Sequence, residues 1–257
     1  MILFRYETLN KRIIIYGNIV TSTPLHIGRG RGEKALGEPD LPIQVLPSGE
    51  PYIPGSSIKG ALRSEIERIV TSLGIRVCIY EKHARNIAPD YECSLEAPCI
   101  SCDIFGSKEI ASKIIIRDAL PIKETKPQST IRPGISLERD TKKVSQGPFL
   151  IEYVPPGTEF RLEIVFENPE DWMLGLLFTG LESIHSIGGQ LSRGMGKVKI
   201  NIEKIEEWTA QSIIQQKPAK TLTNDELKTF IEDCKRNFRE SLEKLKKKYG
   251  ELKRGGK

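Results

Sequence analysis

One stretch of the chain combines the residue types that bind anions. In residues 51–63 (PYIPGSSIKGALR), two prolines and a glycine precede a helical pattern, so Ser56 and Ser57 fall in the first helical turn. The unpaired N–H groups and the dipole of a helix N-terminus attract an anion. Lys59 and Arg63 are four residues apart on a face away from the apolar stripe, so both can lean toward the same anion. The stretch predicts a phosphate seat; the alternative is an ordinarily capped amphipathic helix with solvated cations.

A second group of residues has the composition of a metal site. Three of the five cysteines are crowded between Cys93 and Cys102. The C-x-x-C turn from Cys99 to Cys102 supplies two thiolates, and Cys93 with His83 completes a Cys₃His set for a structural zinc ion with no open position. Cys78 can replace one of these ligands. The alternative is a set of free, half-buried cysteines.

Two glycine-rich loops carry cations. Residues 25–32 (LHIGRGRG) alternate three glycines with Arg29 and Arg31, and residues 188–197 (GGQLSRGMGK) hold one serine and two cations. Such loops let backbone N–H groups approach phosphates closely. Neither loop matches a dinucleotide fingerprint or a P-loop. The candidate phosphate contacts in the second loop are Gly188, Gly189, Ser192, Arg193, Gly194, Gly196 and Lys197.

Two acids lie in the irregular segment between the first glycine loop and the serine turn. Asp40 precedes Pro42, and Glu38 lies two residues before Asp40. A loop carboxylate there is placed to hold a metal or to orient a nucleophile. The competing role for Asp40 is to cap a turn. His185 is interpreted as a contact at a helix C-terminus and not as a catalyst.

The elements that must position these residues follow from hydrophobic periodicity. Their order is strand, helix, strand, strand, helix, strand, which predicts an α+β fold of the ferredoxin-like or RRM-like type. In that fold two helices cover one face of an antiparallel sheet, and the other face is open to RNA in RRM-type domains. Asn168 and Pro169 are the predicted start of the second helix. The predicted strands are residues 12–22, 112–118, 160–166 and 198–202, and the helices begin near Ser56 and Trp172.

Two insertions and a tail account for the remaining length. Residues 75–110 carry the cysteines, and residues 123–150 are predicted to project as a hairpin. We expect residues 1–208 to form one domain and residues 209–257 a C-terminal helical extension. In the extension, Thr223-x-x-Glu226 predicts a capping box, and Cys234 is predicted to be a buried helix thiol.

Composition limits the class of protein. The chain has 257 residues and a net charge of +5, a mild excess that favours a polyanionic partner. No apolar run is long enough to cross a bilayer, and the N-terminus lacks a signal-peptide pattern, so we expect a cytoplasmic protein.

Six short motifs occur in a recognisable order over about residues 11–205. Together they resemble the RAMP superfamily of CRISPR-associated proteins, specifically the repeated backbone subunit of type III (Csm/Cmr-like) effector complexes. The motifs are LHIG (25–28), PGSSIKGALR (54–63), CDIFGS (102–107), IRDA (116–119), VPPGT (154–158) and GGQLSRGMG (188–196).

The resemblance implies a function. Such subunits polymerise along a guide CRISPR RNA together with other type III subunits, and hold its phosphates with the serine-lysine turn and the glycine-rich loop. Residues 123–147 occupy the place of a thumb that wedges into the guide–target duplex. Asp40 falls at the position of a loop aspartate that supports Mg²⁺- or Mn²⁺-dependent cleavage of target RNA. The family leads one to expect more apolar residues directly before this aspartate, but this chain has Glu38-Pro39 there. Glu38 can therefore share or replace the role of Asp40 in cleavage.

Two alternative functions stay open at this point. One is a scaffold subunit that binds guide RNA without cleaving the target. The other is a CRISPR RNA-processing endonuclease of the same superfamily that uses His26 as general acid and base.

Overall fold

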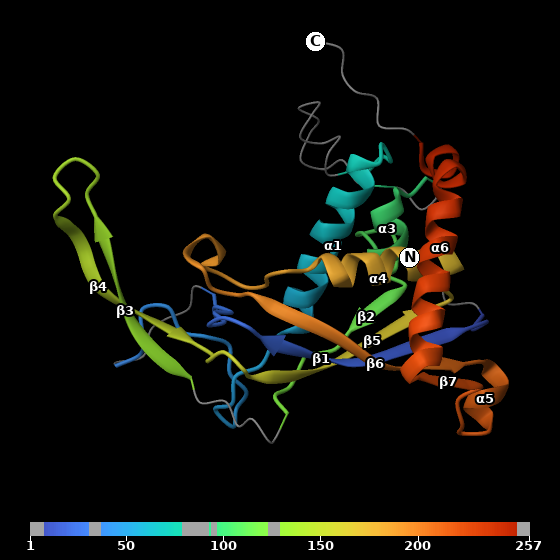
Figure 1. Ribbon diagram of the computed structural model, residues 1–257, viewed down its shortest axis with the longest axis horizontal. Helices are drawn as coiled ribbons and strands as arrows, with labels where there is room; N and C mark the ends of the chain where they lie inside the picture. The colour runs from blue at the N-terminus through green and yellow to red at the C-terminus, as the bar shows by residue number, and fades with distance from the viewer. Residues whose placement is uncertain (1–7, 31–36, 79–92, 94–96, 123–128, 251–257) are drawn as a thin grey trace, which may run out of the picture.

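The computed structural model describes residues 8–30, 37–78, 93, 97–122 and 129–250 (Figure 1). Its centre is a five-stranded sheet with the order β2-β5-β1-β6-β7, in which neighbouring strands are antiparallel. The strands of this sheet are β1 (Arg12–Thr21), β2 (Ile114–Ile116), β5 (Glu159–Glu167), β6 (Val198–Trp208) and β7 (Lys220–Thr223).

The sheet has one buried face because its strands alternate apolar and polar residues. In β1, Ile13, Ile15 and Ile19 are buried, whereas Tyr16 and Asn18 on the other face are half-exposed. A register shift between β1 and β6 lies at Gly17, where an added Cβ would meet the carbonyl oxygen of Asn201 at 2.0 Å. Only glycine allows the two backbones to approach this closely.

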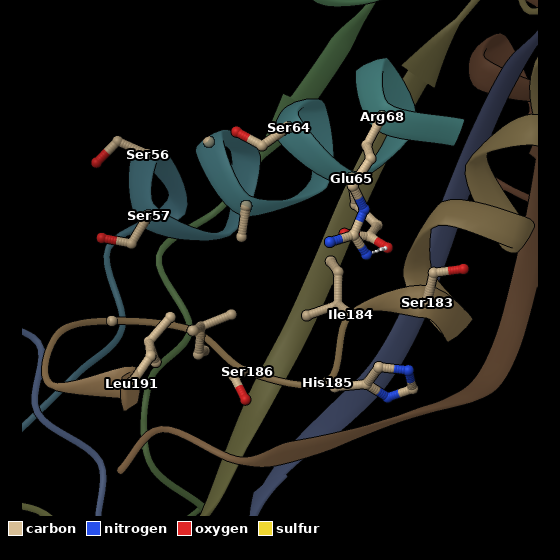
Figure 2. A pocket seen from close by; sticks show the side chains of 14 residues that line it. Ser56, Ser57, Ser64, Glu65, Arg68, Ser183, Ile184, His185, Ser186 and Leu191 are labelled. Atoms are coloured by element: carbon tan, nitrogen blue, oxygen red, sulfur yellow. Dashed lines mark hydrogen bonds and ion pairs between the residues drawn. The ribbon is translucent and has the colours of Figure 1, made fainter. Parts of the chain in front are cut away.

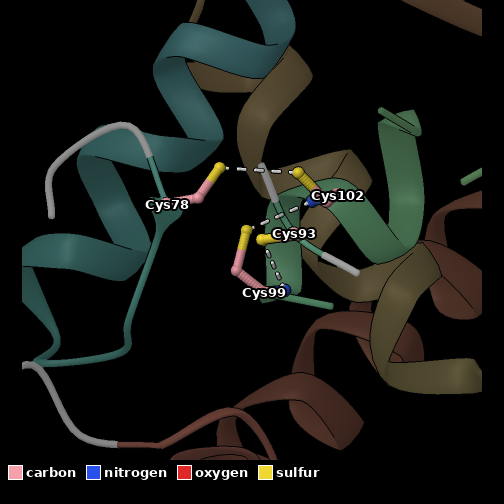
Figure 3. Close-up of side chains that lie close together, drawn as sticks. All are labelled: Cys78, Cys93, Cys99 and Cys102. Carbon is pink, nitrogen blue, oxygen red and sulfur yellow. Dashed lines mark hydrogen bonds between the residues drawn. The ribbon is translucent and has the colours of Figure 1, made fainter. Parts of the chain in front are cut away.

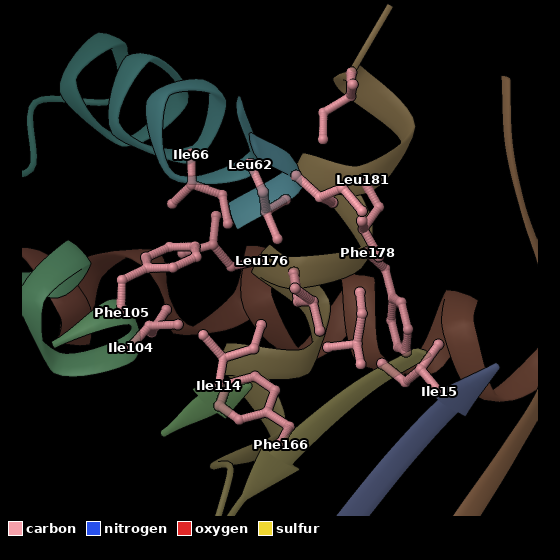
Figure 4. Packing of buried hydrophobic residues seen from close by; sticks show 14 of the residues in the cluster. Ile15, Leu62, Ile66, Ile104, Phe105, Ile114, Phe166, Leu176, Phe178 and Leu181 are labelled. Carbon is pink, nitrogen blue, oxygen red and sulfur yellow. The ribbon is translucent and has the colours of Figure 1, made fainter. Parts of the chain in front are cut away.

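Helices cover the buried face of the sheet (Figure 1). In α1, Ile58, Leu62, Ile66 and Val70 recur every four residues and are buried. These side chains meet α4, α3 and the sheet in one apolar core (Figure 4). The helices are α1 (Gly55–Ser72), α3 (Ile100–Phe105), α4 (Asp171–Ser183), α5 (Ala210–Ile214) and α6 (Asn224–Tyr249), with the short 3₁₀ helix η2 (Leu191–Arg193) after α4.

This architecture confirms the predicted ferredoxin-like α+β fold. The four predicted strands correspond to β1, β2, β5 and β6, and the two predicted helices to α1 and α4. The predicted hairpin is formed by β3 (Thr130–Leu137) and β4 (Val144–Tyr153), which form a separate two-stranded sheet and project from the body (Figure 1).

Two predicted helix caps are wrong. Asn168 does not cap α4, which begins at Asp171 after Glu170. Asn168 instead takes a left-handed conformation (φ 45°), and its Oδ1 accepts the N–H groups of Asn10 and Lys11 at 2.9 and 3.0 Å. The short asparagine side chain therefore closes a turn beside β1.

The predicted capping box at Thr223 is also absent. Thr223 is the N-cap of α6, but its side chain makes no capping hydrogen bond. Asn224 takes a left-handed conformation (φ 50°) directly after β7, which breaks the regular first turn that a capping box needs. A capping box does form at α5, between Thr209 and Ser212.

The C-terminal extension packs on the domain. β7 extends the sheet beside β6, and α6 packs along α4. Gly175 of α4 lies directly against the backbone of Cys234, which is buried as predicted. Within the described residues, every helix is too short or too polar to span a membrane.

Candidate functional site

A cleft of about 630 Å³ lies between α1 and the segment that runs from the end of α4 into the glycine-rich loop (Figure 2). Ser56 and Ser57 line it from α1, and Gly188 and Leu191 line it from the glycine-rich loop. The structure thus brings together two elements that the sequence predicted as phosphate contacts. His185, which the sequence analysis interpreted as a contact at a helix C-terminus, also lines the cleft.

Lys59 and Arg63 do not line the cleft. The Lys59 ammonium donates to Ser112 Oγ at 2.8 Å and to the Ile114 carbonyl oxygen at 3.4 Å. Burial and the neighbouring Arg63 charge lower the pKa of Lys59. Arg63 donates from Nε to Glu67 at 2.8 Å and from Nη2 to Cys102 Sγ at 3.4 Å. Both cations therefore tie α1 to the α3–β2 segment, and their role as anion ligands stays a prediction.

The glycine-rich loop is held against the segment around His26. Gly188 has φ +89°, and a Cβ there would meet the His26 carbonyl oxygen at 2.5 Å. The same oxygen accepts the Gly189 N–H at 2.7 Å, and Gly196 packs against Ile187. Glycine at position 188 lets the loop touch the His26 backbone, and glycine at position 196 lets the two ends of the loop approach each other. The remaining predicted contacts of the loop are exposed: Ser192, Arg193, Gly194 and Lys197.

Asp40 is exposed at the base of the β3–β4 hairpin. Its Oδ2 accepts the Leu150 N–H at 2.8 Å, and the Leu41 N–H donates to the Leu150 carbonyl oxygen at 3.0 Å. Glu152 adds two bonds to the same loop, from its N–H to the Leu41 carbonyl oxygen and from the Ile43 N–H to its carboxylate. The loop that carries Asp40 is therefore attached to β4 through several hydrogen bonds.

The other residues predicted around this loop have ordinary partners. Glu38 accepts from Arg29 at 3.3 Å, and Arg31 lies outside the described residues. His26 is buried, and its Nδ1 lies 2.8 Å from the Glu152 carbonyl oxygen. Because a carbonyl only accepts, Nδ1 carries the proton in this arrangement. His26 thus joins the hairpin base to the glycine-rich loop, which favours a structural role.

Four cysteines form a separate cluster (Figure 3). The sulfur atoms of Cys78, Cys93, Cys99 and Cys102 all lie within 4.8 Å of one another, so the group can hold a metal ion. Cys78 fills the fourth position, as the sequence allowed. His83, the predicted fourth ligand, lies outside the described residues.

The four thiols influence one another's ionisation. Hydrogen bonding from Cys102 holds the pKa of Cys99 well below its usual range, whereas the contact with Cys78 raises the pKa of Cys102. Four thiols this close cannot all ionise unless a cation offsets their charge. The Arg63 guanidinium beside Cys102 supplies part of that positive charge.

Comparisons with known proteins agree with this architecture. A family model described as the RAMP superfamily matches residues 18–199. The CRISPR system Cms endoribonuclease Csm3 of Methanothermobacter thermautotrophicus is 30% identical over 228 residues, which cover 77% of this chain and 86% of that protein.

Two further proteins of the same name are similar. The one from Methanocaldococcus jannaschii is 28% identical over 213 residues, covering 77% of this chain and 82% of its own length. The one from Enterococcus italicus is 30% identical over 207 residues, covering 76% of this chain and 92% of its own. The chain therefore belongs to the RAMP superfamily and, within it, to the Csm3 family of type III CRISPR-associated subunits.

Proposed function

We propose that this chain is a backbone subunit of a type III CRISPR complex that binds guide RNA and cleaves complementary target RNA. Its relatives are named as Csm3 endoribonucleases and match most of its length. The observation that carries the proposal is the exposed Asp40 carboxylate, fixed to β4 at the base of a projecting hairpin.

Guide RNA would follow the cleft and the glycine-rich loop. Serine residues line this path, and Arg193 and Lys197 lie exposed beside it. Such contacts recognise phosphate and sugar and carry little sequence specificity. Successive copies of the chain, bound along one guide with the other type III subunits, would then form a filament.

The hairpin would contact the guide–target duplex. Ile131, Ile135, Val144 and Leu150 are 39–56% exposed on it. Exposed apolar side chains are suited to wedge between bases and unstack them. A nucleotide flipped out at this point would lie near Asp40, because Leu150 exposes its side chain on the hairpin and donates its N–H to the Asp40 carboxylate.

Cleavage would use the flipped nucleotide's own 2′-hydroxyl. The 2′-oxygen attacks the adjacent phosphorus, the bond to the 5′-oxygen breaks, and the 2′-hydroxyl proton is transferred through solvent to that leaving oxygen. The hairpin would supply orientation, and the hydrogen bond from the Leu150 N–H would hold the Asp40 carboxylate beside the reacting phosphate. Glu38 is the second acid of this loop.

A divalent Mg²⁺ or Mn²⁺ ion at Asp40 would stabilise negative charge on the phosphate. Among the described residues, the cysteine cluster is the one group of three or more metal-ligating side chains. Asp40 would therefore share the ion with RNA phosphates and water, which is the usual way proteins bind Mg²⁺ at phosphate sites.

The cysteine cluster fits a structural zinc ion. A tetrahedral ZnS₄ site with Zn–S bonds of about 2.3 Å separates its sulfurs by roughly 3.8 Å. The Cys78 and Cys102 sulfurs are 3.6 Å apart, close to this spacing. Four thiolates leave no open position, so the ion would stabilise the insertion and take no part in cleavage.

The test is a complex reconstituted with guide RNA, labelled complementary RNA and Mg²⁺ or Mn²⁺. We expect cuts at regular intervals, with 5′-hydroxyl and cyclic-phosphate or phosphate 3′ ends. A 3′-hydroxyl product would refute the mechanism. Target bound but uncut would make the chain a scaffold. Cutting of isolated repeat hairpins, lost on His26→Ala, would make it a processing enzyme.

Guide binding has a test of its own. Ser57→Glu puts a carboxylate into the cleft, and we expect it to weaken retention of guide RNA. Ser72→Glu, at the exposed far end of the same helix, is the matched control. If both variants retain guide RNA equally well, guide RNA does not pass through the cleft.

A further inference from the structure

The last turn of α6 is held by the two segments that supply the cysteines. Tyr249 and Asp103 are both buried, and the Tyr249 hydroxyl donates to Asp103 Oδ2 at 2.5 Å. Asp103 directly follows the cluster residue Cys102 in the chain and also lies 3.5 Å from the Lys113 ammonium. One wall of the Tyr249 site is thus attached to the cysteine cluster.

The second wall comes from the segment that ends at Cys78. The Arg76 N–H donates to the Gly250 carbonyl oxygen at 3.2 Å, and the Arg76 side chain donates to the Tyr249 carbonyl oxygen at 3.3 Å. These bonds satisfy carbonyl groups at the end of the helix, which have no partner within it. Arg76 is two residues from Cys78, so its position depends on where that thiol is held.

The start of α4 forms the third wall. The Tyr249 ring packs edge-on against Trp172, with ring centroids 5.8 Å apart. The neighbouring Lys248 forms an ion pair of 2.9 Å with Glu170. We call this whole contact, of Tyr249 with Arg76, Asp103 and Trp172, the C-terminal latch.

We propose that metal binding at the cysteine cluster and docking of the C-terminal helix through the C-terminal latch are coupled. A metal ion that gathers Cys78 and Cys102 fixes Arg76 and Asp103 as the site for Tyr249. Coupling between two binding events is reciprocal, so docking of α6 also raises the affinity of the cluster for metal. The inference rests on the metal assignment of the cluster and not on RNA cleavage.

This coupling gives the extension a specific role. The family model ends at residue 199, whereas α6 begins at Asn224. A segment outside the matched region thus stabilises a metal site inside it, and α6 is attached to the domain at both β7 and the cysteine cluster.

The test uses the full-length protein with its metal content measured first. Zinc affinity is determined by competition with a chromogenic chelator for wild type, Tyr249→Phe and the control Tyr16→Phe. Tyr249→Phe keeps the ring against Trp172 and removes the hydrogen bond to Asp103. Tyr16 lies on the face of the sheet opposite to the buried isoleucines of β1, and its hydroxyl is 3.4 Å from Glu206. We expect Tyr249→Phe to lower zinc affinity roughly fivefold or more, and Tyr16→Phe to leave it unchanged.

Hydrogen exchange gives the reciprocal measurement. Removing zinc under reducing conditions should speed amide exchange in residues 242–250 while β1 stays protected. If zinc removal also speeds exchange in β1, the whole domain has opened and the exchange data no longer isolate α6. The zinc affinity of Tyr249→Phe then decides whether the two events are coupled. Unchanged affinity in Tyr249→Phe, or unchanged exchange in α6 after zinc removal, overturns the coupling. A purified protein that binds no metal overturns the metal assignment and the coupling with it.

Discussion

The contact between α4 and α6 allows a prediction with a defined sign. An added Cβ at Gly175 would lie 2.1 Å from the Cys234 carbonyl oxygen and 2.8 Å from Phe238 Cβ. To restore an ordinary contact near 3.4 Å, α6 would have to move outward by about 1.3 Å. The atoms nearest to the added Cβ belong to the backbone of Cys234, so no side-chain rotation relieves the overlap.

The change in the free energy of unfolding expected for Gly175→Ala is the sum of two opposing contributions. Alanine is a better helix former than glycine by about 1 kcal/mol. Overpacking a well-filled interface costs about 1–3 kcal/mol, and contact with rigid backbone places Gly175→Ala at the upper end. The net destabilisation is about 2 kcal/mol, which for a chain of this size lowers Tm by about 4–8 °C.

Gly60→Ala is the matched control, because Gly60 also lies within a helix but an added Cβ meets nothing within 4 Å among the described residues. Gly60→Ala should gain only the higher helix propensity of alanine, about 1 kcal/mol, and raise Tm by about 2–4 °C. Thermal unfolding followed by circular dichroism measures both variants. A Gly175→Ala protein as stable as wild type would refute the close α4–α6 packing.

Three further predictions concern other contacts. Cys99→Ser keeps an oxygen that can accept the Cys102 N–H at the start of α3, but should lose bound metal in native mass spectrometry, whereas Cys234→Ser should keep it. Burial raises the pKa of Cys234 to about 11, so at pH 8 its thiol stays protonated and iodoacetamide should modify it slowly until urea unfolds the protein. Asn168→Ala removes an acceptor of two N–H groups at a left-handed position and should cost about 2 kcal/mol in urea unfolding, with a smaller loss for Asn168→Asp.

Each of these predictions has a contrary result. Full metal occupancy in Cys99→Ser would remove that thiolate from the site. Fast alkylation of Cys234 in the folded protein would show that α6 opens readily. Equal stability of Asn168→Ala and Asn168→Asp would mean that the turn before α4 does not depend on the side-chain oxygen.

The sequence predicted the sheet because its signal is local. Alternation in β1 and β5, and the four-residue spacing from Ile58 to Val70, reflect which side chains are buried. The order of these elements then favours few topologies. The hairpin was predictable from the length and polarity of residues 123–150, but its partner register was not.

The sequence could not predict contacts between distant segments. Asp40 was chosen by position and resemblance, yet its hydrogen bond to Leu150, 110 residues away, has no sequence signal. The face of α1 that carries Lys59 and Arg63 was identified, but the acceptors that α3 and β2 place beside it were not. Likewise, spacing gave candidate ligands without deciding that Cys78 joins the other cysteines.

Cap assignments were wrong for a related physical reason. Asn168 and Thr223 are of the residue types that cap helices, but side chains of these types also form turns. At Asn168 the adjacent segment before β1 offers two N–H groups, and the turn forms in place of the cap.

The most direct test of the proposed function compares two substitutions in the assembled complex. Asp40→Asn keeps an oxygen for the Leu150 N–H and removes the charge, whereas Asp225→Asn makes the same change at an exposed position in the first turn of α6. Cleavage of labelled target RNA is measured with target binding in parallel. We predict that Asp40→Asn abolishes the regularly spaced cuts while binding persists, and that Asp225→Asn cuts like wild type. Unchanged cutting by Asp40→Asn would contradict the account and move catalysis to Glu38 or another subunit.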